Sequence, residues 1–173
     1  QRNLGPQSTL GFPFGNAPSF RSFSPTDEPT RVFPRMIDLI LNQPPSIREV
    51  LPSSSRDLDF AVTVRDNHPG SGGLAWDYVS FESSANAGPF VLLEPNGDDG
   101  VEWETNTMQE VKWDVANTDA SPVNCGTVDI ILSYSNGARF DFILKEDTPN
   151  DGLTSVLVPD SVSTKARIMV KAH

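Results

Sequence analysis

Apolar and polar side chains alternate along much of the chain, which is the pattern of β-strands with one buried face. The clearest run places an apolar residue at every second position, at Leu58, Phe60, Val62 and Val64. A glycine-rich segment, 67–75, separates this run from a second one over 76–82. The pattern predicts a β-hairpin over 57–83, with Val79 and Phe81 continuing the inward face.

After residue 86 the alternation continues in shorter runs bounded by turn residues. The predicted strands are 89–94, 101–104, 108–115, 127–135, 138–145, 153–158 and 165–172. Asn136-Gly137 favours a tight turn because both residue types accept positive φ. Trp113 has core parity between Val111 and Val115. About seven short strands around a core tryptophan predict an immunoglobulin/fibronectin III-like β-sandwich.

The N-terminal part of the chain has a different character. Residues 1–34 are rich in Pro, Gly, Ser and Phe, which predicts an irregular coil held to a core by its aromatic rings. Residues 35–42 carry apolar side chains at helical spacing after Pro34, so we expect one short helix. The prediction is all-β, with a partial β-domain over 1–86 and the sandwich over 87–173.

Composition narrows the range of partners. The chain has 173 residues, with 13 basic and 23 acidic ones, and a net charge of −10. This field repels phosphate backbones and anionic lipids, so we expect no nucleic-acid partner and no membrane insertion. No apolar run approaches the length of a transmembrane helix. The single cysteine, Cys125, excludes an internal disulfide.

Two aspartates are the candidate metal ligands. Asp66 and Asp77 have the parity of the inward face at the two ends of the glycine-rich loop, so the sequence places their carboxylates close together. A Ca²⁺ ion completed by loop carbonyls or Asn67 would relieve their repulsion. The alternative is loop capping, in which each aspartate accepts backbone N–H groups. Two carboxylates are few for a calcium site, and this favours capping.

Catalytic chemistry finds little support in the residue pattern. His68 lies in a Pro-Gly loop with no cysteine and no second histidine nearby in the sequence. No G-x-S-x-G nucleophile motif occurs. Cys125 precedes a strand with no basic neighbour, as a small buried hydrophobe does. Trp76, Trp103 and Trp113 are expected in cores, although exposed rings would suit a carbohydrate. We predict no catalytic residue in this chain.

A series of collinear segments resembles a known family. The segments are Phe20-Arg21-Ser22-Phe23-Ser24-Pro25, Arg31-Val32-Phe33-Pro34-Arg35, Leu51-Pro52 with Arg56, Thr63-Val64-Arg65-Asp66-Asn67, Ala87-Gly88-Pro89-Phe90, Val111-Lys112-Trp113-Asp114-Val115-Ala116, Pro122-Val123-Asn124-Cys125, Val128-Asp129-Ile130, Thr148-Pro149-Asn150-Asp151-Gly152 and Ala166-Arg167-Ile168-Met169-Val170-Lys171. They resemble the tandem β-sandwich region behind the catalytic domain of secreted bacterial reprolysin-like zinc metallopeptidases. The likeness covers most of the chain.

The resemblance implies a secreted or cell-surface, non-catalytic accessory domain that acts as a spacer, a stabiliser or a substrate-docking module. In similar proteins zinc belongs to a catalytic domain with an H-E-x-x-H helix, which His68 and His173 alone cannot form. The family's first β-domain begins before the position of Gln1, and a further strand follows that of His173. We therefore expect an open sheet edge that pairs with the parent's catalytic domain, with another fragment or with a second copy.

Two rival interpretations remain open from the sequence. The first is a carbohydrate-binding or adhesion β-sandwich, which requires Trp76 or Trp103 on a solvent face. The second is part of an intact enzyme whose remaining chain is separate.

Overall fold

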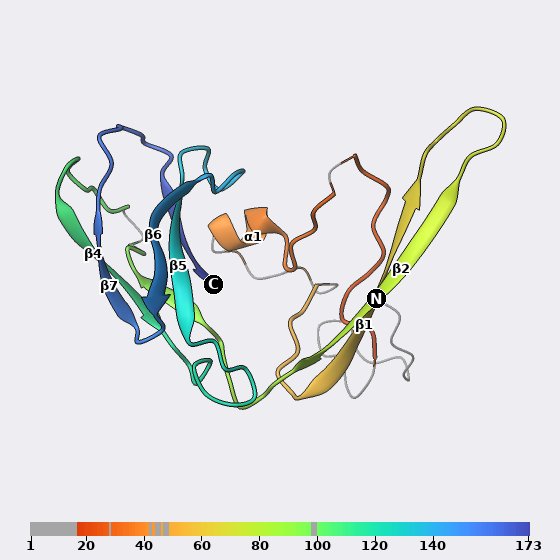
Figure 1. The fold of residues 1–173 in the computed structure, drawn as a ribbon, viewed down its shortest axis with the longest axis horizontal. Helices are drawn as coiled ribbons and strands as arrows, with labels where there is room; N and C mark the ends of the chain where they lie inside the picture. Colours follow the sequence, from red (N-terminus) through yellow and green to blue (C-terminus); the bar gives the residue numbers. More distant parts are fainter. Residues whose placement is uncertain (1–16, 28, 42, 44–45, 47–48, 98–99) are drawn as a thin grey trace. The chain divides into compact units, whose positions relative to one another are not determined.

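A computed structural model describes residues 17–27, 29–41, 43, 46, 49–97 and 100–173. These residues form one short helix and eight β-strands, so the all-β prediction is confirmed (Figure 1). The chain divides into two compact units, Gln1–Ala85 and Asn86–His173. Each unit is described separately below.

The main element of the first unit is a long hairpin. Strands β1 (Arg56–Arg65) and β2 (Leu74–Ser83) pair antiparallel along their full length. The register places Leu58 opposite Phe81 and Phe60 opposite Val79. Directly opposed residues of an antiparallel pair share a face, so these apolar side chains lie together as the alternation predicts.

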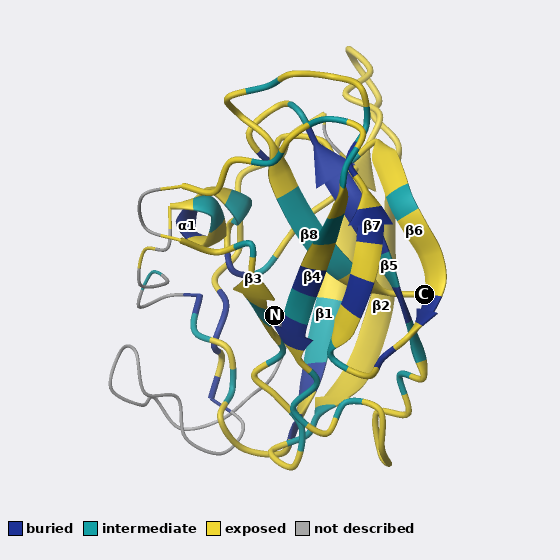
Figure 2. Cartoon of the chain, turned by 90° about the vertical axis from the view of Figure 1, so that its left-hand side faces the viewer, coloured by how far each residue is buried: buried dark blue, intermediate teal, exposed yellow. Residues whose placement is uncertain are grey.

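The burial of this apolar face ends part-way along the hairpin. Leu58 is buried and Phe60 is half-buried. Towards the loop, however, the side chains of Val62, Val64 and Val79 are 57–60% exposed. Figure 2 shows β2 coloured as exposed along most of its length. The prediction of a buried inward face is therefore wrong for this half of the hairpin. Alternation sets which face a side chain takes, but the described part of the unit covers only the end near Leu58.

The coil before the hairpin is attached by aromatic rings. Phe20 is buried, and its ring centroid lies 4.8 Å from that of Phe33 and 5.7 Å from that of Phe60. Phe60 in turn stacks on Phe81 at 5.5 Å. This is the role that the sequence predicts for the coil's phenylalanines, although Phe12 and Phe14 lie outside the described residues.

A short helix and a buried carboxylate complete the described part of this unit. Helix α1 (Met36–Ile40) occupies the centre of the segment where the sequence predicts a helix, and residue 42 lies outside the described residues. Glu49 is only 1% exposed. Its Oε1 pairs with Nη2 of Arg31 at 2.8 Å, and its Oε2 accepts the Arg35 N–H at 3.1 Å.

The second unit contains two three-stranded antiparallel sheets. One has the strand order β3-β4-β7, from β3 (Val91–Glu94), β4 (Met108–Asp114) and β7 (Leu153–Leu157). The other has the order β6-β5-β8, from β6 (Phe142–Pro149), β5 (Thr127–Ser133) and β8 (Arg167–Ala172).

Both sheets contribute to one hydrophobic core. Its fully buried members are Val111, Trp113, Val128, Ile130 and Val156, which come from β4, β5 and β7. Alternating side chains reach the core from each sheet, as the sequence predicts for Val111, Trp113, Val128 and Ile130.

Two predicted strands of this unit differ from the structure. Residues 101–104 form no strand, and β6 begins at Phe142 rather than at residue 138. Asn136 and Gly137 do adopt positive φ, and Ser133 Oγ accepts the N–H of Gly137, so the chain turns before it re-enters the sheet. The β5–β6 register also shifts on both sides of Ile130. These irregularities break the alternation, and Phe142, which is predicted to point inward, is exposed.

Candidate functional site

The glycine-rich hairpin loop is organised around Asp66. Its Oδ1 accepts the N–H of His68 at 3.0 Å and the N–H of Gly73 at 2.9 Å. The His68 N–H, followed by the Gly73 N–H, holds the pKa of this carboxyl below its ordinary value of 3.8. A Cβ atom at Gly73 would lie 2.9 Å from Asp66 Oδ2, which explains why the chain carries glycine there. Asp66 therefore caps the loop.

Asp77 lies elsewhere on the hairpin. It is opposite Val62 on β2, so four strand positions separate it from Asp66, about 13 Å at the usual rise of a strand. Its Oδ1 accepts the N–H of Tyr78 at 2.8 Å. The two aspartates have the same parity, as predicted, but the structure does not bring them together. The described residues contain no group of three or more His, Cys, Asp or Glu placed to hold a metal, and calcium binding at Asp66 and Asp77 stays a prediction.

The remaining sequence candidates occupy ordinary positions. His68 is an exposed loop residue whose backbone N–H belongs to the Asp66 cap. Cys125 is half-buried beside the core of the second unit, where its Sγ lies 3.4 Å from the Thr127 carbonyl oxygen. Neither residue contacts a partner that would activate it in the described part of the chain.

Two aromatic side chains form an exposed surface that the sequence does not predict. Trp76 and Tyr78 lie on the same face of β2, opposite Thr63 and Ala61, and are 59% and 53% exposed. The core position expected for Trp76 is therefore wrong, whereas Trp113 is in the core and Trp103 packs half-buried against it. Alternation predicts that Trp76 and Tyr78 share a face of β2. Only the exposed fractions of the two side chains in the structure show that this face is open to solvent.

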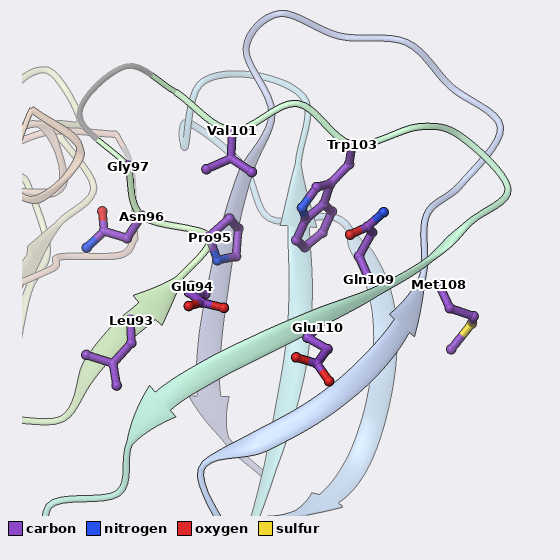
Figure 3. A pocket seen from close by; sticks show the side chains of 10 residues that line it. All are labelled: Leu93, Glu94, Pro95, Asn96, Gly97, Val101, Trp103, Met108, Gln109 and Glu110. Atoms are coloured by element: carbon purple, nitrogen blue, oxygen red, sulfur yellow. The ribbon is translucent and has the colours of Figure 1, made fainter.

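A shallow hollow lies at one end of the β3–β4 pair. Figure 3 shows its lining, which includes Trp103, Gln109 and two carboxylates. Lys112 lies two positions beyond Glu110 on β4, and its Nζ is 2.8 Å from Glu94 Oε2 and 3.4 Å from Glu110 Oε2. The bond to Glu94, followed by that to Glu110, raises the pKa of Lys112 above 10.5. Among the described residues that line this hollow there is no serine, cysteine or histidine.

Asp129 on β5 and His173, which directly follows β8, form a pair of titratable groups with shifted pKa values. Asp129 Oδ1 accepts the Asp147 N–H at 3.0 Å and lies 2.8 Å from His173 Nδ1. The Asp147 N–H is the main cause of the lowered pKa of Asp129, and His173 adds to it. In return, the hydrogen bond and charge of Asp129 raise the pKa of His173 above its ordinary 6.5.

This pair predicts a local pH dependence. Because the folded state holds the His173 proton more tightly, the stabilisation is fully present below the unfolded-state pKa near 6.5. It is lost as pH rises through the higher folded-state pKa. We expect an NMR titration of the His173 ring to give a lower pKa in Asp129→Asn than in the wild type. Identical pKa values in the two proteins would show that the ion pair is absent in solution.

Comparison of the chain with protein-family models, with curated proteins and with solved structures finds no match in any of the three. None of the helices in the described residues has the length and apolar character needed to cross a membrane.

Proposed function

We propose that this chain is a non-catalytic accessory module of a secreted bacterial zinc metallopeptidase, and that its second unit is an immunoglobulin/fibronectin III-like sandwich. The observation that carries the proposal is the exposed apolar surface of the β1–β2 hairpin. Its side chains from Val62 to Phe81 are half or more exposed: Val62, Val64, Leu74, Trp76, Tyr78, Val79 and Phe81. The register divides them between the two faces of the hairpin: Leu74, Trp76 and Tyr78 lie on one face, and Val62, Val64, Val79 and Phe81 lie on the other. Exposed apolar side chains on both faces suit contact with another macromolecule rather than bond-breaking chemistry.

The fold and the residue resemblance support the same proposal. Two antiparallel sheets around the Trp113 core are the arrangement that a sandwich module requires. The segments that resemble the metallopeptidase family include β4 around Trp113 and the end of β1 with its loop. In this role the chain is a spacer or a docking surface, and zinc belongs to the parent's catalytic domain.

Peptidase assays test the absence of catalysis. The purified chain, with Zn²⁺ added, is expected to leave casein intact in a zymogram and in a solution assay. The Asp66→Asn/His68→Ala double variant is the matched control, because it removes the histidine side chain of the hairpin loop and the carboxylate that caps this loop. Turnover by the wild type that the double variant lacks would overturn the proposal and would place an active site in the loop.

One observation favours a second function, carbohydrate binding. Trp76 and Tyr78 expose their rings from one face of a strand, with Thr63 and Ser80 as polar neighbours on that face. Sugar rings stack on such aromatic surfaces and hydrogen-bond to the polar groups beside them. Native gels that contain polysaccharides distinguish the two functions. Retardation that Trp76→Ala abolishes and Trp103→Ala preserves would favour carbohydrate binding, and a glycan array without binding would exclude it.

A further inference from the structure

The outer edge of β1, away from β2, has backbone groups at Ala61, Thr63 and Arg65 that pair with no strand among the described residues. Within the described residues β1 pairs only with β2. The Asp66 N–H donates to the Gly73 carbonyl just beyond the last strand pair, so even-numbered residues direct their backbone groups towards β2. Backbone groups alternate in direction along an antiparallel strand. The N–H and C=O groups of Ala61, Thr63 and Arg65 therefore point to the open edge.

Only half of this edge is accessible. Arg56 and Leu58 are buried at the beginning of β1, where Arg56 Nη2 donates to the Ala17 carbonyl at 2.7 Å. From Ala61 to Arg65 every residue is exposed. The stretch between Asp59 and Arg65 contains no charge, proline or bulge, the features by which proteins usually block an open edge.

The accessible stretch is complementary to itself. If two copies of β1 lie antiparallel about a two-fold axis at Val62, then residues whose numbers sum to 124 face each other. Asp59 then meets Arg65, Phe60 meets Val64, Ala61 meets Thr63, and Val62 meets Val62. Opposite charges and apolar pairs across neighbouring strands each stabilise a sheet. Because of the two-fold axis, each of these pairs occurs twice in the dimer, except the Val62–Val62 pair, which occurs once.

The charged ends of this register are suited to the pairing. None of the ion pairs among the described residues involves Arg65. Asp59 accepts the Ser80 hydroxyl at 2.6 Å, and a carboxylate offers further acceptor positions to a guanidinium.

The neighbouring registers of two antiparallel β1 strands pair their side chains less favourably. Centring on Ala61 requires the buried Arg56 and Leu58, and centring on Thr63 places Phe60 opposite Asp66.

We propose that the open edge of β1 binds β1 of a second copy of this chain, antiparallel and centred on Val62. The result is a four-stranded sheet with the order β2-β1-β1-β2. A hairpin of two strands is marginally stable alone, and additional strands are what such an element requires. The interaction is isologous, so it closes at a dimer. This inference concerns the hairpin edge and does not depend on the proposed accessory function.

Sedimentation velocity of the full chain over a range of concentrations tests the dimer. We expect a monomer–dimer equilibrium for the wild type. Thr63→Pro removes an N–H that points to the open edge, so it is expected to give a monomer. Ser80→Pro is the matched control, because it places proline at the outer edge of β2, and it is expected to keep the dimer. A wild type that stays monomeric at all concentrations, or dimerisation that Thr63→Pro leaves unchanged, would overturn the proposal.

Charge reversal tests the register. Arg65→Glu places like charges at both ends and is expected to weaken dimerisation by about tenfold or more. The double variant Asp59→Arg/Arg65→Glu restores the opposite charges and is expected to recover the dimer. A double variant as weak as the single one would rule out this register.

A cross-link locates the symmetry axis. In a Cys125→Ser background, Val62→Cys places two thiols directly opposite each other, at a position without interstrand hydrogen bonds in the new pair. Mild oxidation is expected to give a covalent dimer from this variant and little from Val64→Cys, whose counterpart is Phe60. Equal cross-linking of the two variants would contradict a dimer centred on Val62.

Discussion

Asn150→Ala is expected to lower the free energy of unfolding of the second unit by about 3 kcal/mol. Asn150 is 5% exposed and connects three parts of the unit. Its Oδ1 accepts the Trp113 indole N–H at 2.8 Å, and its Nδ2 donates to Thr118 Oγ1 at 3.0 Å and to the Cys125 carbonyl at 2.9 Å. Alanine removes all three hydrogen bonds and leaves the Trp113 donor buried without an acceptor.

Urea denaturation followed by tryptophan fluorescence measures this loss. A Trp76→Phe background leaves Trp103 and Trp113, which both belong to the second unit. The expected decrease corresponds to a drop in Tm of about 12 °C or more for a unit of this size. Asn96→Ala is the matched control, because Asn96 is exposed and makes one side-chain bond, to the Leu92 carbonyl. A loss for Asn150→Ala no larger than that of the control would show that this network does not stabilise the core.

The importance of Asn150 is a feature that sequence patterns do not reveal. The segment 150–152 predicts a turn, and Gly152 does adopt a positive φ of 93°. Nothing in the local pattern indicates that the asparagine side chain points into the core towards Trp113. The periodicity of β4 and β5, in contrast, is sufficient to predict Val111, Trp113, Val128 and Ile130 as core residues. Periodicity reports on a strand's own faces, whereas the Asn150 contacts come from residues 25–37 positions away.

The hairpin shows the same limit for the candidate site. Alternation correctly predicts that Asp77 shares its face with Val62 and Val79. It does not show how far along the strand Asp77 lies from Asp66, because that distance depends on the register of the pair. Arg65 and Leu74 form the last strand pair before the loop, and Asp77 lies three pairs farther down the hairpin. The alternative of loop capping agrees with the hydrogen bonds of Asp66, and its signal in the sequence is Gly72-Gly73.

Local sequence patterns also do not predict which positions on one face of a strand become buried by other parts of the chain. Alternation predicts equivalent inward positions for Phe60 and Val64. In the structure, Phe60 lies against Phe20 and Phe33, whereas Val64 is 60% exposed. Which apolar positions become buried depends on where the preceding coil crosses the hairpin. That course depends on long-range contacts such as the Phe20–Glu49 bridge.

Glu49→Ala is expected to destabilise the first unit by about 2 kcal/mol. Glu49 is buried, so its carboxylate depends on its partners, Arg31 and the Arg35 N–H. Arg31 also lies over the ring of Phe23, with its Cζ 3.5 Å from the ring centroid. Loss of the carboxylate leaves the Arg35 N–H unpaired and frees Arg31 from its position over Phe23. This loss is smaller than the usual cost of breaking a buried ion pair because Arg31 is partly exposed to water.

Hydrogen exchange along β1 and β2 measures this effect without interference from the second unit. A loss of about 2 kcal/mol corresponds to exchange about 30-fold faster at amides that exchange through opening of the unit. Glu49→Gln keeps one acceptor oxygen and is expected to accelerate exchange less than Glu49→Ala. Glu82→Ala, at an exposed position of β2, is the matched control and is expected to leave exchange unchanged. Because Glu49 connects Arg31, Arg35 and Phe20, equal exchange in Glu49→Ala and Glu82→Ala would mean that the coil and the hairpin open independently, and the buried carboxylate would then have no stabilising role.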